Sequence, residues 1–178
     1  MEYLRSEKEY IYLNYVCERV ESYFPEAQTM LDVGSNTGLY LKRFEWIPSV
    51  TAIDILTVPS FDFVNGIKAN FLEHDFEGQS FEVVTCLQML EHVKNPRDFF
   101  VKMVELTKGV LIVSLPYKWS ADSIADHIHD PIDDKKMMDW FGAFPTHCCT
   151  ITEPENRGIR VICLFRFYDE KQKERYYG

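Results

Sequence analysis

Short apolar segments alternate with segments of helical periodicity along most of this chain. This alternation predicts a parallel β-sheet with both faces covered by helices, because parallel strands need long crossover connections. The last two apolar segments are separated only by the turn-forming residues "ENRG", so they must pair antiparallel. We therefore predict a three-layer α/β/α sandwich with a mostly parallel seven-stranded sheet and an antiparallel last strand. The expected strands are residues 29–34, 49–55, 67–72, 81–87, 109–117, 146–154 and 158–170, with helices over 38–45 and 96–107.

The 178 residues fit one domain, since single hydrophobic cores commonly contain roughly 100 to 200 residues. Residues 1–25 form a leading segment in which the apolar positions of 2–23 follow a helical repeat, so we expect an amphipathic helix there. Residues 117–145 exceed the length of an ordinary connection. They predict a substrate-side insertion or lid that carries one helix over about 132–141.

Composition excludes several classes of protein. A net charge of −9 and a pI near 5.0 argue against a nucleic-acid partner, which requires a concentrated basic surface. No apolar stretch approaches the roughly 20 residues that span a bilayer, and the first residues lack the apolar core of a secretory signal. We expect a cytoplasmic protein without a membrane partner and leave its oligomeric state open. The five cysteines contain no C-x-x-C pair and predict reduced thiols.

The sequence "LDVGSNTG", residues 31–38, predicts a strand followed by a tight turn into a helix. Gly34 allows the turn, Gly38 allows a close approach, and the free backbone N–H groups of the turn are expected to face a crevice at the sheet's carboxyl edge. The residues after Gly34 break the G-x-G-x-x-G pattern of dinucleotide-binding turns, so a pyrophosphate is disfavoured. Asp32 would repel a phosphate but suits a ligand with an amine and a positive centre.

Together with "FEVVTCLQMLEHVKNP" at residues 81–96, this turn resembles the class I S-adenosylmethionine-dependent methyltransferases. The first motif of that family is an acidic residue followed by G-x-x-x-G, and many members carry the buried strand, the LEHV turn and the proline of the second segment. The resemblance covers about residues 28–117. It implies a Rossmann-like fold, methyl transfer and S-adenosylmethionine as the cofactor. Within this segment, Glu91 and His92 are expected to brace the turn rather than to act in catalysis.

The resemblance also implies roles for individual residues. Asp54 would accept the ribose hydroxyls and Asp75 the adenine amino group, with Phe76 packed on the base. Leu87 and Gln88 would line the methionine end. The alternative for "EHDFE" is a solvated acidic turn. The predicted cofactor-binding residues are Asp32, Gly34, Ser35, Gly38, Asp54, Ile55, Asp75, Phe76, Leu87 and Gln88.

The stretch "DHIHDPIDD", residues 126–134, supplies His127 and His129 as candidate catalytic bases. Transfer of a methyl group from a sulfonium mainly requires alignment of donor and acceptor, so one base that takes a hydroxyl proton suffices. The alternative is a polar lid with solvated histidines and Asp130 as the N-cap of the following helix. No metal site is predicted, since residues at i and i+2 do not share a helical face.

The segment 117–145 also resembles small methyltransferases, similar to type 11, that are encoded with bacterial surface-polysaccharide and sugar-modifying enzymes. This likeness implies a small polar acceptor, a hydroxyl of a sugar or sugar nucleotide. Trp119, Trp140 and Phe141 would then form an aromatic wall, unless they simply pack within the lid. Two other functions stay open, a nicotinamide-dependent oxidoreductase and a non-catalytic module that binds S-adenosylmethionine.

Overall fold

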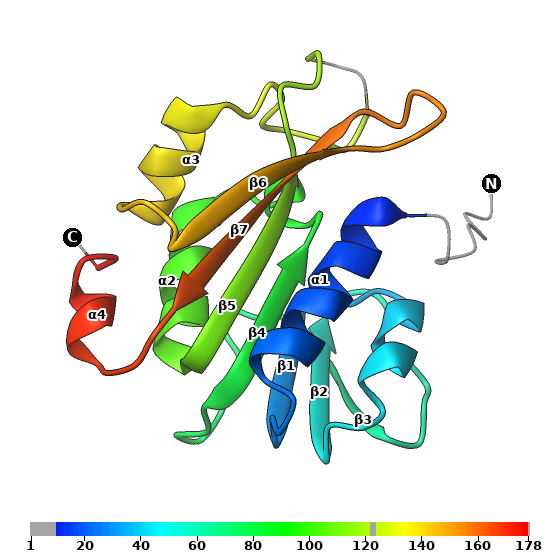
Figure 1. Ribbon diagram of the computed structural model, residues 1–178, viewed down its shortest axis with the longest axis vertical. Coiled ribbons are helices and arrows are strands. Elements are labelled where there is room, and N and C mark those ends of the chain that lie inside the picture. The colour runs from blue at the N-terminus through cyan, green and yellow to red at the C-terminus, as the bar shows by residue number, and fades with distance from the viewer. Residues whose placement is uncertain (1–9, 122–123, 178) are drawn as a thin grey trace.

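The computed structural model describes residues 10–121 and 124–177, which form a seven-stranded sheet flanked by helices (Figure 1). No helix in these residues is long and apolar enough to cross a membrane. The strands are β1 (Thr29–Val33), β2 (Ser49–Asp54), β3 (Val64–Lys68), β4 (Phe81–Leu87), β5 (Thr107–Pro116), β6 (His147–Thr152) and β7 (Ile159–Arg166). The helices are α1 (Ile11–Tyr23), α2 (Pro96–Leu106), α3 (Asp134–Phe141) and α4 (Lys171–Glu174), with 3₁₀ segments η2 (Leu39–Phe44) and η3 (Leu90–His92).

The strand order is β3-β2-β1-β4-β5-β7-β6. Neighbours from β3 to β5 are parallel, whereas β7 is antiparallel to both β5 and β6. The predicted sheet, including its antiparallel last strand, is therefore confirmed. The third strand lies at Val64–Lys68 rather than 67–72, because this edge strand is half exposed and lacks the apolar run of the inner strands. A six-residue 3₁₀ segment replaces the helix expected over 38–45, since only residues 39–48 connect the glycine turn to β2.

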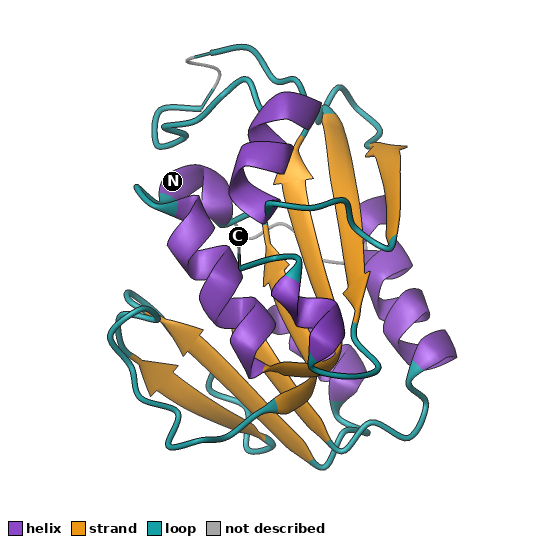
Figure 2. Cartoon of the chain, turned by 90° about the vertical axis from the view of Figure 1, so that its left-hand side faces the viewer, coloured by secondary structure: helices purple, strands orange, loops and turns teal. Residues whose placement is uncertain are grey.

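Two apolar cores lie on opposite faces of the sheet, and Figure 2 shows helices on both sides of the strands. Helix α1 covers one face through Val16 and Val20, which are one helical turn apart and fully buried. Helices α2, α3 and α4 cover the other face. There, Phe100 of α2 contacts three rings at centroid distances of 4.7 to 5.9 Å, those of Phe141, Phe165 and Tyr176.

The segment between β5 and α3 lies beyond the carboxyl ends of the parallel strands, at the top of Figure 1. Helix α3 begins at Asp134, and Asp133 is its N-cap, because the Asp133 carboxylate accepts a hydrogen bond from the Lys136 N–H at 2.9 Å. The alternative that Asp130 caps this helix is therefore wrong. The carboxylate of Asp130 instead binds a ring nitrogen of His127.

Gly34 follows β1 in a backbone conformation that favours glycine, and Met89 packs directly against it. Gly34 and Gly78 have nearly equal φ angles of +77° and +76°. A Cβ at Gly34 would lie 2.3 Å from Met89 Cγ, whereas a Cβ at Gly78 meets no heavy atom of the described chain within 4 Å. Both positions carry the same backbone strain, but only Gly34 adds a steric overlap.

We predict that Gly34→Ala lowers the free energy of unfolding by about 1–3 kcal/mol more than Gly78→Ala, because the overlap with Met89 adds to the left-handed backbone strain of about 1–2 kcal/mol. Urea unfolding of both variants and the wild type measures this difference. Equal losses in the two variants would show that Met89 moves aside at no cost.

Candidate functional site

Asp32 and Asp54 lie at the same edge of the sheet, on adjacent strands. In the β1–β2 pair, Asp32 is opposite Ala52 and Val33 is opposite Ile53, so Asp54 follows one position later. The two carboxylates are close enough for the charge of Asp54 to raise the pKa of Asp32, although burial of Asp32 is the larger cause. Ligands of open α/β sheets bind at this carboxyl edge. The structure therefore brings these two predicted positions together.

The side chain of Asp32 is buried, and only one of its two oxygens is paired. Oδ1 accepts hydrogen bonds from the Tyr40 hydroxyl and from Thr85 Oγ1, the latter at 2.7 Å. Oδ2 has no hydrogen-bond partner among the residues that the structure describes. Burial raises the pKa of Asp32 to about 6, although the two hydroxyls lower it. A cation beside Oδ2 would stabilise the ionised carboxylate.

The backbone N–H groups at the start of the glycine turn point toward β2. The N–H groups of Gly34 and Ser35 both donate to the Ile53 carbonyl, at 2.9 and 3.3 Å. The N–H of Asn36 donates to Asp54 Oδ2 at 3.0 Å. The prediction that the N–H groups of the turn face the crevice is therefore wrong for these three residues. The buried hydroxyl of Ser35, by contrast, has no partner within the described chain and is a polar group that a ligand could satisfy.

Asp54 holds the loop that follows β2. Its Oδ1 accepts hydrogen bonds from the N–H groups of Leu56 and Thr57, at 2.7 and 3.2 Å. The neighbouring side chains of Ile55 and Leu56 are 63% and 75% exposed, which is unusual for large aliphatic residues beside a structured carboxylate. They form a short apolar surface next to Asp54, suited to the flat face of a base or sugar. Ile55 was predicted from the sequence, and Leu56 was missed.

The turn after β4 places Leu87 and Gln88 at the same edge. Gln88 has a φ of +55°, and its N–H donates to the Ser114 carbonyl of β5 at 2.9 Å. The Gln88 side-chain amide also donates to Ser114 Oγ, at 3.2 Å. Both residues are half-buried. Leu87 and Gln88, which were predicted to line the methionine end, therefore lie near the glycine turn, because the next residue, Met89, contacts Gly34.

Phe76 lies near the amino end of β4, opposite to the carboxyl edge that holds Asp32 and Asp54. Its side chain is 5% exposed, and its ring centroid is 5.9 Å from that of Phe81, the first residue of β4. The seven residues of β4 separate that end from Leu87 by about 20 Å. The predicted packing of Phe76 on a base is therefore wrong. The neighbouring Asp75 is exposed and accepts a hydrogen bond from the Glu77 N–H at 2.8 Å, as a solvated turn would.

Asn70 is the polar residue that follows β3 at the crevice edge. The N–H of Ala69, one residue earlier, donates to the Asp54 carbonyl at 3.1 Å. Asn70 is half-buried, and its amide group bonds the Leu72 N–H and the Glu73 carboxylate. With the third strand predicted over 67–72, Asn70 would lie inside a strand, whereas β3 ends at Lys68 and leaves Asn70 just beyond it.

Three hydrogen bonds join the lid segment to the turn after β4. Ring Nδ1 of His92 lies 3.0 Å from the Asp126 carbonyl, and the Ile128 N–H donates to the Glu91 carbonyl at 3.0 Å. Nε2 of His129 lies 2.7 Å from the Val93 carbonyl. Residues separated by more than thirty positions are thus fixed together, so the backbone of Glu91 and the ring of His92 do brace this region.

The two candidate bases have different surroundings. His129 uses Nε2 in its bond to Val93, and its ring packs edge-on against Trp140 at 5.0 Å. His127 instead has Nδ1 2.8 Å from Asp130 Oδ2, which leaves Nε2 for other partners. A carboxylate at Nδ1 favours the tautomer in which Nε2 carries the lone pair. The geometry therefore favours His127 over His129 as a base.

Glu91 is fully buried beside the two imidazoles. Neither oxygen of its carboxylate has a hydrogen-bond partner within residues 10–121 and 124–177. Burial raises the pKa of Glu91 to about 8, although the charge of Arg160 lowers it. One ligand atom each of Glu91, His92 and His127 lies within 4.8 Å of the others. These three residues could hold a divalent cation. From the sequence, a metal was weighed only for His127 and His129 with a nearby carboxylate, and no metal site was predicted.

The aromatic wall expected for a sugar acceptor is not available. Trp140 and Phe141 are 7% and 1% exposed and pack within the core beneath the lid. Trp119 is half-buried, and its ring already contacts the Arg160 guanidinium at 4.2 Å and the His127 ring at 5.7 Å. Trp140 and Phe141 therefore have a packing role, as the alternative expected, but they pack against the core rather than only within the lid.

Comparison with known proteins identifies the family. A family model described as a methyltransferase domain matches residues 7–157. The chain is 33% identical over 118 residues to a ubiquinone biosynthesis O-methyltransferase of Rickettsia bellii, covering 58% of this chain and 49% of that protein. It is 32% identical over 100 residues to the mitochondrial ubiquinone biosynthesis O-methyltransferase of Schizosaccharomyces pombe, covering 48% and 36%. The chain thus spans about half the length or less of these curated relatives.

Solved structures share the fold at low sequence identity. The 1,6-didemethyltoxoflavin-N1-methyltransferase of Burkholderia thailandensis, solved with S-adenosylhomocysteine, has a TM-score of 0.72 and 14% identity, covering 91% of this chain and 80% of that one. The N-methyltransferase NodS of Bradyrhizobium japonicum, with the same ligand, has a TM-score of 0.69 and 12% identity, covering 87% and 85%. This chain therefore has a Rossmann-like methyltransferase fold. This chain belongs to the methyltransferase-domain family.

The raised pKa of Glu91 predicts a pH dependence of stability. The folded protein keeps a proton on this carboxyl up to about pH 8, whereas the unfolded chain releases it near pH 4.5. Stability therefore falls as the pH rises from 4.5 to 8. We predict that Glu91→Gln unfolds at similar urea concentrations to the wild type near pH 4.5 but is more stable by about 4 kcal/mol at pH 8. Unfolding in urea plus EDTA tests this, and parallel pH profiles would contradict it.

Proposed function

We propose that this protein transfers the methyl group of S-adenosylmethionine to a hydroxyl of a small-molecule acceptor. The observation that carries the proposal is the buried Asp32, which keeps one carboxylate oxygen without a hydrogen-bond partner in the described residues, at the ligand-binding edge of a methyltransferase fold. S-Adenosylmethionine carries a sulfonium and an ammonium group, and a cation of this kind compensates such a carboxylate. A nicotinamide cofactor is not favoured, because its pyrophosphate would be repelled there.

The proposed cofactor site uses the carboxyl ends of β1, β2 and β4. Asp32 faces the cationic end, Asp54 accepts the ribose hydroxyls, and Leu87 and Gln88 line the methionine chain. Gly34, Ser35 and Gly38 form the turn beside the ligand, although Met89 packs against Gly34 and Pro59 against Gly38. Ser35 offers its hydroxyl, and Ile55 is the apolar contact. Asn70, rather than Asp75, is then the polar group closest to the base. Two solved structures that share this fold were determined with S-adenosylhomocysteine, which supports a ligand of this class.

We propose that the acceptor binds where residues 126–130 meet the turn after β4. His127, oriented by Asp130, takes the hydroxyl proton on Nε2 while the acceptor oxygen attacks the methyl carbon in line with sulfur. The relatives named as O-methyltransferases support oxygen as the methylated atom. A hydroxyl of a sugar or sugar nucleotide belongs to this class of acceptor, although its recognition would then rest on polar groups rather than on an aromatic wall.

One observation favours a second role for the same cluster. The unpaired carboxylate of Glu91 lies beside His92 and His127, each of which has Nδ1 near an acceptor oxygen and Nε2 left for a ligand. Carboxylate and imidazole groups in this arrangement bind divalent cations. A cation there would bind the acceptor hydroxyl and lower the pKa of that hydroxyl. His127 would then not be needed as a base.

Cofactor binding should depend on the ionisation of Asp32. Because its pKa is about 6 in the empty site, a cationic ligand binds the ionised form and lowers that pKa. We predict that the affinity for S-adenosylmethionine rises by about tenfold from pH 5 to pH 7 and that Asp32→Asn binds more weakly with a flat profile. Isothermal titration calorimetry measures both profiles.

Asp75→Asn serves as the control for that experiment, because Asp75 is exposed and binds the Glu77 N–H in its own turn, so the affinity of this variant should match the wild type. A folded protein that binds neither S-adenosylmethionine nor S-adenosylhomocysteine would refute the proposed cofactor.

The two histidines should separate in a methylation assay. With labelled S-adenosylmethionine and fractionated small-molecule extract as acceptor, His127→Gln should lower the rate by about 10²-fold or more at unchanged cofactor affinity. His129→Gln should mainly lower the melting temperature, because the variant weakens the bond to Val93. Equal rate losses in both would contradict the role of His127.

Chelation decides between the two roles of the cluster. Activity that survives EDTA assigns His127 as the base. If EDTA abolishes the activity and added Mg²⁺ or Mn²⁺ restores it in the wild type, the cluster binds a cation. Added metal should then not restore the activity of Glu91→Gln.

A further inference from the structure

Two cysteines face each other on the strands that close the sheet. In the antiparallel β6–β7 pair, Cys148 is directly opposite Cys163. Directly opposed residues of antiparallel strands have Cα atoms about 4.5–5.5 Å apart, within the range of about 4.4–6.8 Å that disulfides span. The backbone of the sheet therefore already has the spacing that a cross-strand disulfide needs.

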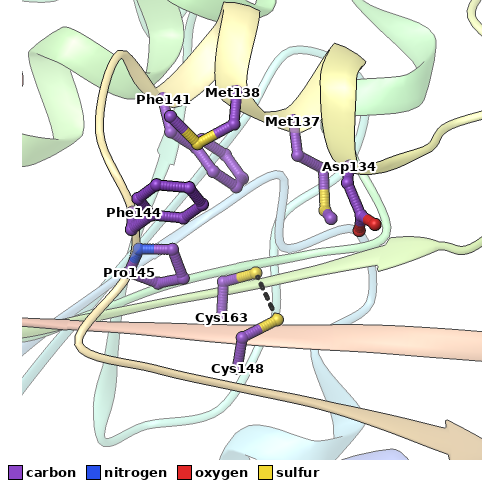
Figure 3. Close-up of a pocket in the computed structure, with 8 residues that line it drawn as sticks. All are labelled: Asp134, Met137, Met138, Phe141, Phe144, Pro145, Cys148 and Cys163. Atoms are coloured by element: carbon purple, nitrogen blue, oxygen red, sulfur yellow. Dashed lines mark hydrogen bonds between the residues drawn. The ribbon is translucent and has the colours of Figure 1, made fainter.

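The two thiols also point toward each other. Their Sγ atoms are 3.5 Å apart, and Figure 3 shows both side chains directed at the same cavity. This cavity of about 260 Å³ lies between α3 and the two strands. Its wall is mainly apolar and consists of Met137, Met138, Phe141, Phe144, Pro145, Cys148 and Cys163, with Asp134 at one side. Formation of a bond of about 2.05 Å requires the sulfur atoms to move closer and the two side chains to reach a dihedral angle of about ±90° around that bond.

The pair combines one accessible and one buried sulfur. Cys148 is exposed at the sheet edge, whereas Cys163 is 1% exposed. The hydrogen bond between them lowers the pKa of Cys148 and raises that of Cys163, because the Cys163 thiol stabilises a Cys148 thiolate. The thiolate is the form that reacts with oxidants. An attacking residue and a resolving residue are thus already in contact.

We propose that Cys148 and Cys163 form a reversible cross-strand disulfide when the protein meets a hydroperoxide. The Cys148 thiolate attacks one peroxide oxygen, the O–O bond breaks, and the sulfur becomes a sulfenic acid while hydroxide leaves and takes up a proton as water. The Cys163 thiol then attacks that sulfur, loses its proton, and releases a second water as the S–S bond forms. Two thiols lose two electrons in total, and one hydrogen peroxide gains them.

The disulfide would tie the edge strand β6 to β7 on the side that faces α3. It links positions on either side of the β6–β7 turn, and such a cross-link stabilises the folded state by restricting the unfolded chain. The adjacent Cys149 provides a matched control. Its side chain alternates to the other face of β6, where it packs against the core under α1.

Mass spectrometry of the full-length protein tests the proposal. The protein is treated with hydrogen peroxide, its remaining thiols are alkylated, and it is digested with trypsin without reduction. We expect residues 137–157 linked to residues 161–166, with a mass lower by two hydrogen atoms than the sum of the two peptides. The link should persist in Cys149→Ser, disappear in Cys148→Ser and reverse with dithiothreitol. Oxidised wild type should also melt at a higher temperature than reduced wild type, with no such shift in Cys148→Ser.

Three results would overturn the proposal. The first is a link that persists in Cys148→Ser, since it would then involve Cys149. The second is oxidation of Cys148 only to sulfinic acid with Cys163 still alkylated. The third is a link found only between two chains on a non-reducing gel. Thermal unfolding of both variants in the reduced state shows that they are folded, so each result bears on the cysteine pair itself.

Discussion

The burial of one carboxylate at the carboxyl edge of the sheet is the constraint on which the site depends. Asp32 stands on the inner strand β1, between β2 and β4, and its side chain is buried. Tyr40 and Thr85 stabilise one of its oxygens, and the other has no partner in the part of the chain that the structure describes. Burial of an unpaired charge destabilises a fold, which explains the pKa near 6. A cationic ligand removes that penalty, so the feature that weakens the empty protein also selects the ligand.

The acceptor side depends on a different principle, the joining of two distant segments by backbone hydrogen bonds. Carbonyl groups of Glu91 and Val93 bind the lid near His127 and His129, so the lid is held at the turn rather than solvated. The carboxylate of Asp130 then orients His127. The histidine that stays available is the one whose Nδ1 has a carboxylate partner, whereas His129 is fixed by its other nitrogen.

Much of the fold could be predicted from the sequence because strand periodicity and connection length are local signals. They gave the sheet and the carboxyl edge that holds Asp32 and Asp54. The errors arose where long-range packing decides. Phe76 follows an acidic residue in the sequence, but its aromatic ring is buried near the start of β4. The sequence offers Asp130 as an N-cap, but the carboxylate of Asp133 accepts the capping hydrogen bond. The importance of the Glu91 carboxylate depends on its burial, which no local pattern reports.

Asp32 and Glu91 flank the turn after β4, and they share one property. Each is buried, each has at least one carboxylate oxygen without a partner in the described residues, and each has a raised pKa. In a chain with a net charge of −9, two such groups in one region destabilise the empty protein as the pH rises. Structural carboxylates are normally paired, so two unpaired ones indicate that stability has been given up for binding. In the proposed function, the positive end of the cofactor would compensate Asp32, and a proton or a divalent cation would compensate Glu91.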